Sequence, residues 1–86
     1  MKLVFEAHAW EHFLHWQETD RATLRKINGL IKECLRHPYD GTGKPEALRG
    51  DLSGVWSRRI DREHRLVYRV KDDAVEVISC RYHYQP

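Results

Sequence analysis

Apolar side chains recur at helical spacing through the first half of the chain. Residues 9–17 repeat them every three or four positions, which predicts a helix ending near Gln17. Thr19 or Asp20 can cap a second helix by accepting a hydrogen bond from a free N–H group in its first turn. Pro38 disfavours helical backbone in the residue before it, so the second helix should end there. The apolar stripe of this helix consists of Leu24, Ile27, Leu30, Ile31, Cys34 and Leu35.

Beyond a Gly- and Pro-rich loop at residues 38–45, the apolar period changes to two. This alternation predicts strands at residues 55–61, 65–70 and 75–82 or beyond, with a turn at residues 71–73. Residues 3–5 are wholly apolar and predict a short first strand in the centre of the sheet. The expected order is β-α-α-β-β-β, an α+β fold in which two N-terminal helices cover one face of a small antiparallel sheet. Arg65, Val67 and Arg69 alternate onto the opposite face, which should be open and basic.

Length and composition limit the class of protein. A chain of 86 residues allows one domain, residues 1–86, and 41% hydrophobic with 33% charged residues excludes a disordered tail or a membrane span. The apolar run at residues 3–5 is too short for a signal-peptide core. Cys34 and Cys80 lie in apolar-patterned segments and are expected to be small core residues rather than a disulfide. We therefore expect a reduced, cytoplasmic protein.

The net charge of +2 is unevenly distributed. Residues 44–69 carry seven bases and four acids, and six of the seven bases are Arg, whose planar guanidinium matches phosphate geometry. A solvated, salt-bridged strand face explains the same charges.

Two short motifs do not support the chemistry that they suggest. His8 and His12 with Glu11 match the zinc-peptidase pattern H-x-x-E-H, but such enzymes need a third, distant ligand and a substrate cleft. We expect these histidines and His15 to be solvated on the polar side of the first helix. The Gly41–Lys44 segment resembles a P-loop, but Pro45 stands where the magnesium-binding hydroxyl belongs, so nucleotide hydrolysis is excluded. The glycines are expected to allow a sharp turn and a close approach.

Three polar residues provide the groups that RNA cleavage requires. A carboxylate at Glu46 can take the proton of a ribose 2′-hydroxyl, and Arg65 can stabilise charge on phosphorus. An imidazolium at His83 can protonate the leaving 5′-oxygen. Arg81 and His83 share a strand face if the last strand extends that far. The alternative is that a terminal His-Tyr pair is a frayed, exposed end.

Several blocks of the sequence closely resemble the YoeB/Txe branch of the RelE-like bacterial toxins. The resemblance runs in order along nearly the whole chain. It is carried by residues 16–17, 26–28, 30–32, 43–46, 52–54, 56–60, 64–68 and 80–84, and the Ser-Arg-Arg-Ile and His-Tyr blocks are the most specific.

The resemblance implies a ribosome-dependent endoribonuclease that cleaves messenger RNA in the ribosomal A site, without a metal or cofactor. The family carboxylate falls on Glu46, the arginine on Arg65, and the His-Tyr pair on His83 and Tyr84. His83 is then the general acid, and Tyr84 shapes the site or stacks on a base. Glu63 is expected to lie on the strand face of Arg65 and to orient it. Supporting contacts to RNA are expected from Lys44, Arg49, Arg59 and Arg81.

The resemblance also implies a YefM-like antitoxin as partner and a homodimer. A second hypothesis is a non-catalytic inhibitor of the same fold that binds a partner such as DNA gyrase. This hypothesis predicts that Glu46, Arg65 and His83 are dispensable. A third is a silent relic that binds antitoxin and does nothing else.

Overall fold

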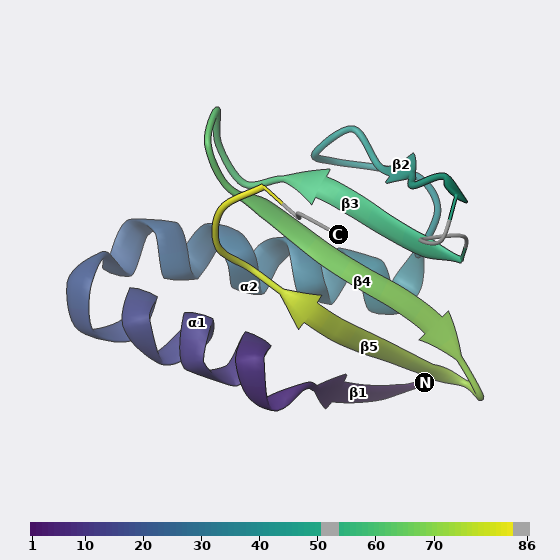
Figure 1. Ribbon diagram of the computed structural model, residues 1–86, viewed down its shortest axis with the longest axis horizontal. Coiled ribbons are helices and arrows are strands. Elements are labelled where there is room, and N and C mark those ends of the chain that lie inside the picture. Colours follow the sequence, from purple (N-terminus) through teal and green to yellow (C-terminus); the bar gives the residue numbers. More distant parts are fainter. Residues whose placement is uncertain (51–53, 84–86) are drawn as a thin grey trace.

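The computed structural model describes residues 1–50 and 54–83, which form two helices and a five-stranded sheet. The elements in chain order are β1 (Lys2–Phe5), α1 (Ala7–Thr19), α2 (Arg21–Arg36), β2 (Glu46–Ala47), β3 (Val55–Arg59), β4 (Arg65–Lys71) and β5 (Ala74–Ser79). The strand order across the sheet is β1-β5-β4-β3-β2, and both helices pack against the same face (Figure 1). The predicted α+β class and the placement of the helices are confirmed.

The sheet is mixed rather than wholly antiparallel. The pairs β3–β4 and β4–β5 are antiparallel, as predicted, and β2, which was not predicted, pairs antiparallel with β3. By contrast, β1 runs parallel to β5. A parallel neighbour requires a crossover, which the rest of the chain between β1 and β5 provides. The prediction of a central first strand was wrong: β1 is an edge strand, and Leu3 and Val4 are 43% and 42% exposed. The apolar run does not distinguish an edge from a centre because both places accept apolar residues.

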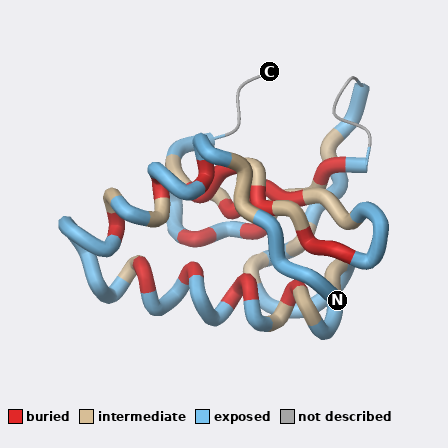
Figure 2. The backbone as a smooth tube through the Cα atoms, turned by 90° about the horizontal axis from the view of Figure 1, so that it is seen from below, coloured by how far each residue is buried: buried red, intermediate tan, exposed pale blue. Residues whose placement is uncertain are grey.

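α2 buries the apolar stripe that the sequence predicts. In α1 the prediction was wrong at Trp10 and Leu14, which are 48% and 38% exposed, because this helix turns Ala9, His12 and Trp16 toward the core. Asp20 caps α2, where its side chain accepts a hydrogen bond from Thr23 N over 3.1 Å. The buried positions of the helices recur on the side that faces the sheet (Figure 2). They meet a strand layer that includes Leu66, Tyr68, Val75 and Val77. Cys34 and Cys80 are free and fully buried, as predicted.

Two irregularities in the sheet determine where its ends lie. Asp72 and Asp73 have φ angles of 53° and 59° and form the predicted tight turn between β4 and β5. Further along, Val67 pairs with Ser79 while Tyr68 pairs with Val77, so Ile78 is an extra residue in β5. The strand ends directly after this bulge, at Ser79, three residues short of the predicted Tyr82.

No helix among the described residues combines the length and apolar character that crossing a membrane requires.

Candidate active site

The register of the sheet brings three predicted residues onto the face opposite the helices. Glu46 in β2 pairs with Ser57, which pairs with Val67 in β4, while Arg59 pairs with Arg65. Directly paired residues point to the same side, and residues two apart share it. Glu46, Arg59 and Arg65 therefore lie on one face. Strand spacing and rise place the Cα atoms of Glu46 and Arg65 roughly 12 Å apart.

This face is basic, as predicted, but its middle is not open. Val67 is fully buried although it points away from the helices. Arg65 and Arg69, two positions away on either side, are half-buried. Arg69 donates to Glu76 of the neighbouring strand, so part of the predicted positive charge is neutralised within the sheet. The remaining positive charge of this face lies at the end of the sheet that carries Arg59 and Arg65.

Glu46 is placed by a loop that the buried side chain of Arg58 holds in position. The Arg58 guanidinium donates to the carbonyl oxygens of Thr42, His37 and Asp40 over 2.9, 2.5 and 2.8 Å. The Tyr68 hydroxyl accepts from Arg58 Nε over 3.2 Å and donates to the carbonyl of Pro38 over 2.6 Å. These bonds satisfy carbonyls that the loop cannot pair with itself.

The predicted role of the loop glycines is confirmed at Gly43. It has a φ of 87°, and a Cβ there would approach the carbonyl oxygen of Arg59 to 3.2 Å. Its own carbonyl accepts from Arg59 N over 2.7 Å, which ties the loop to the end of β3. Lys44 follows with a φ of 52° and is exposed. Arg49 is exposed beyond β2.

Arg59 and Arg65 line a cavity of about 380 Å³ together with Lys26, Asp61 and Arg62. We call this the basic pocket. Arg65 Nη1 donates to the carbonyl oxygens of Asp61 and His64 over 2.7 and 3.1 Å, which fixes the guanidinium at the pocket. An Arg side chain has five N–H donors, so further donors remain for a ligand. The pocket therefore has four cationic side chains and one carboxylate in its lining, and this excess of positive charge favours the binding of a phosphate.

The expected role of Glu63 was wrong. Glu63 does not lie on the strand face of Arg65, because the structure places it in the turn before β4. The carboxylate of Glu63 lies 3.5 Å from His64 Nε2 rather than against Arg65. The carboxylate of Asp61 shapes this turn instead, since Oδ1 accepts from the N–H groups of Glu63 and His64 over 2.8 and 2.7 Å. Arg65 is oriented by carbonyl oxygens rather than by a carboxylate.

The segment that carries His83 is not a strand. The predicted extension of the last strand to Tyr82 was wrong: β5 ends at Ser79, so the condition for a shared strand face of Arg81 and His83 is not met. Side chains replace the missing strand partner. His12 Nδ1 accepts from Cys80 N over 3.2 Å, and His64 Nδ1 accepts from Tyr82 N over 2.7 Å.

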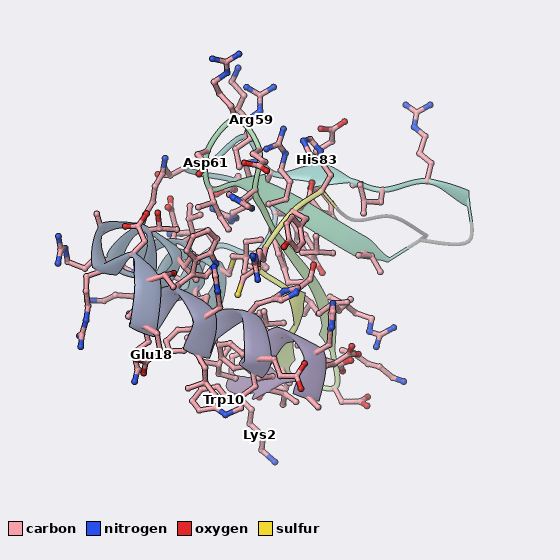
Figure 3. All side chains as sticks on the ribbon, turned by 60° about the vertical axis from the view of Figure 1, so that its left-hand side comes forward. Lys2, Trp10, Glu18, Arg59, Asp61 and His83 are labelled. Carbon is pink, nitrogen blue, oxygen red and sulfur yellow. The ribbon has the colours of Figure 1, made fainter. Side chains whose placement is uncertain are left out.

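The carbonyl groups of the same two residues are also bound. Trp16 Nε1 donates to Cys80 O over 2.8 Å, and Arg65 N donates to Tyr82 O over 3.1 Å. The last bond joins the segment directly to the predicted catalytic arginine. His83 follows at the surface, on the same side of the molecule as Arg59 and Asp61 and away from Trp10 (Figure 3). Tyr84 lies outside the described residues.

His12 is buried, which contradicts the expectation of a solvated row of histidines. It is 8% exposed and stacks edge-on against His8, which is exposed. Burial lowers the pKa of His12 to about 4, and the charges of His8, Arg81, His15 and His64 add to the effect. The neutral ring is the form that accepts a hydrogen bond at Nδ1. Among the described residues, no group of three or more His, Cys, Asp or Glu is arranged to hold a metal ion.

Sequence reasoning missed four residues around the site. Lys26 and Arg62 complete the basic pocket, and His12 and His64 hold the segment before His83. Lys26 follows Arg25 in the sequence, and Arg62 belongs to the arginine-rich stretch, so charge alone gives a weak signal for both. Nothing in the sequence pattern indicates that either imidazole bonds to the backbone of residues 80–82.

Comparison with known proteins gives a consistent family. The model of the YoeB-like toxins of bacterial type II toxin–antitoxin systems matches residues 5–84. Toxin YoeB of Escherichia coli K12 is 55% identical over 84 residues, covering 98% of this chain and 100% of that protein. The solved YoeB/ParE toxin from Agrobacterium tumefaciens is 51% identical with a TM-score of 0.95, covering 98% of this chain and 100% of that one. The solved YoeB–YefM complex from Staphylococcus aureus is 41% identical with a TM-score of 0.89, covering 98% of each chain. The chain therefore belongs to the YoeB family of type II toxins, as its sequence blocks indicate.

Proposed function

We propose that this toxin cleaves messenger RNA in the ribosomal A site, with general acid–base catalysis by its own side chains. Glu46 removes the proton from a ribose 2′-hydroxyl, and the 2′-oxygen attacks the adjacent phosphorus. The P–O2′ bond forms as the P–O5′ bond breaks, which gives a 2′,3′-cyclic phosphate. His83 transfers its proton to the departing 5′-oxygen. Arg65 stabilises the charge that develops on the phosphoryl oxygens.

One observation carries this proposal: the sheet register and the Arg65–Tyr82 hydrogen bond bring the Glu46, Arg65 and His83 segments to the same side of the molecule. Arg59, Lys26 and Arg62 extend the site as phosphate contacts, which the cavity between them supports. We retain Tyr84 as a residue that shapes the site or stacks on a base, and Lys44, Arg49 and Arg81 as RNA contacts. The endoribonuclease activity of the family favours this reading over a gyrase inhibitor.

The same family evidence points to its partners. The Staphylococcus aureus relative is solved as a YoeB–YefM complex and as a YoeB dimer. We propose a YefM-like antitoxin for this chain, and a homodimer in its absence. Its site of action is the cytoplasm, where translating ribosomes are.

Primer extension on one defined messenger tests the function. Ribosomes are stalled with an empty A site and incubated with the toxin or with His83→Ala. We expect a cut within the A-site codon, and a rate lower by roughly 10²–10⁴-fold for the variant, the usual contribution of one general acid. His15→Ala is the control, because it removes an imidazole from α1 at a position that does not line the basic pocket. A loss below tenfold in His83→Ala would overturn the role of His83. Absence of any cut by folded toxin would favour the gyrase inhibitor.

A further inference from the structure

A second cavity, of about 550 Å³, lies between the N-terminus of α1, the end of β5 and the segment after it. We call it the α1 cavity. In the strand order, β1 and β5 lie toward the edge of the sheet opposite β2, which carries Glu46. The polar lining of the α1 cavity includes Glu6, His8, His12, Ser79, Arg81 and His83. Its size is within the range of cavities that hold small ligands. The exposed ring of His83 lines the cavity, so the cavity adjoins the proposed site of cleavage.

Two buried polar atoms in this lining lack a hydrogen-bond partner among the described residues. Ser79 is 6% exposed, and its Oγ bonds to nothing described. The Nε atom of Arg81 is likewise buried and unpartnered. A buried polar atom without a partner is energetically costly, so such atoms at a cavity wall indicate a missing partner. Both atoms can donate a hydrogen bond, which favours an acceptor-rich ligand.

The charges around the cavity favour an anion. Arg81 forms no ion pair within the described chain, and its guanidinium lies 4.5 Å from the centre of the Tyr82 ring, which holds it beside the cavity. The carboxylate of Glu6 lies 3.7 Å from Arg69 Nη2 and shares this cation with Glu76, and burial and the neighbouring Glu76 carboxyl raise its pKa, which favours its neutral form. The N-terminus of α1 borders the cavity without a side-chain cap and without an acidic residue in its first turn. Its free N–H groups and dipole also favour negative charge.

We propose that the α1 cavity binds the phosphate on the 3′ side of the nucleotide that leaves during cleavage, through Arg81, Ser79 and the N-terminal turn of α1. This inference rests on the proposed function, which places the leaving 5′-oxygen at His83. The nucleotide that carries this oxygen then extends away from Glu46, toward the α1 cavity. Its 3′-phosphate is the next anion along the strand. Binding this phosphate aligns the leaving group with the general acid.

The test compares two dinucleotides whose first sugar is 2′-deoxy and therefore cannot be cut. One ends in a 3′-hydroxyl and the other in a 3′-phosphate, and each is titrated into the free toxin by calorimetry. We expect the terminal phosphate to tighten binding about tenfold, the size of one charge-assisted hydrogen bond. Arg81→Gln should abolish this gain, and Ser79→Ala should reduce it. His15→Ala, in α1 but outside the cavity, should retain the gain in affinity.

Equal affinity for the two dinucleotides would overturn the proposal, as would a gain that survives in both variants. Inorganic phosphate is titrated separately. If it binds as tightly as the phosphorylated dinucleotide, the cavity holds free phosphate rather than RNA, and the proposal fails. Ser79→Ala removes a single unpartnered oxygen, so a folded variant is expected and its result is interpretable. A toxin that cuts messenger normally but shows no phosphate preference would refute this inference alone, whereas absence of cutting would refute the proposed function.

Discussion

At the scale of single residues, two imidazole rings act as backbone acceptors next to the proposed general acid. The Nδ1 atoms of His12 and His64 accept hydrogen bonds from Cys80 N and Tyr82 N. In a regular strand, the carbonyl groups of a neighbouring strand would accept these bonds. Each ring can accept its hydrogen bond only while its Nδ1 carries no proton. Protonation of His12 therefore removes a bond that positions His83, and the folded protein resists that protonation.

We predict that His12 makes the stability of the toxin depend on pH between about 6.5 and 4. Unfolded His12 binds a proton near its ordinary pKa of 6.5, whereas burial lowers the folded pKa to about 4. The unfolded state then holds more protons within this window, so stability is full above it and falls as pH decreases through it. The loss is roughly 2–3 kcal/mol. Urea unfolding at a series of pH values measures it.

His12→Asn is the matched control for this pH dependence. Its amide oxygen can accept the same hydrogen bond, and the side chain does not titrate. All other titrating groups remain, so the difference between the two proteins isolates His12. We expect a shallower loss of stability for His12→Asn on acidification. Parallel curves for the two proteins would show that the folded pKa of His12 is not lowered.

The candidate residues themselves were accessible to sequence reasoning, but their orientation was not. The chemistry of Glu46, Arg65 and His83 makes them candidates, and the resemblance to the YoeB/Txe branch gives each of them a role. The orientation of Arg65 could not be predicted, because it depends on carbonyl oxygens, which have no sequence signature. Burial of His12 was missed because its helical position lies at the border of the apolar stripe, and tertiary packing decided its environment.

At the scale of elements, the loop before β2 depends on one buried cation. Arg58 is fully buried and bonds three loop carbonyls and the Tyr68 hydroxyl. We predict that Arg58→Leu lowers the free energy of unfolding by roughly 3–5 kcal/mol, because these acceptors remain buried without a donor. Chemical denaturation measures the loss.

Glu33→Gln provides the comparison for Arg58→Leu. Glu33 faces Arg58 at 3.7 Å from the partly exposed side of the loop, and Gln keeps an oxygen that can accept from Thr42 N. We expect the variant to change stability by less than about 1 kcal/mol. If the two variants lose similar stability, the ion pair rather than the buried carbonyl bonds holds the loop.

Helices and strands differ in how much of them the sequence predicts. Both helices follow from their apolar stripes, the Asp20 cap and Pro38, all of which are local features. The two-residue strand β2 and the bulge at Ile78 depend on pairing with distant residues, so local alternation does not reveal them. β5 ends directly after that bulge, so Arg81 and His83 lie beyond the strand and do not share a strand face.

At the scale of the whole molecule, the sheet lies between the hydrophobic core and three of the proposed site residues. One face packs against α1 and α2, and the other carries Glu46, Arg59 and Arg65. The sequence predicts this division because apolar alternation fixes which residues face the helices. It does not predict the parallel β1–β5 pair, since strand order depends on how the crossover folds back.

The proposed catalytic groups come from separate segments, which determines how the free toxin should behave. Glu46 lies on a two-residue edge strand, and His83 follows the last strand; both are exposed. The toxin alone therefore provides a surface that fixes a flexible RNA only weakly. We predict that naked messenger is cut at least about 10³-fold more slowly than the same messenger in a stalled ribosome, because the ribosome holds the codon against the site. Rates are compared by primer extension, with His83→Ala in both conditions to subtract background. Comparable rates with and without ribosomes would mean that the toxin surface positions RNA by itself.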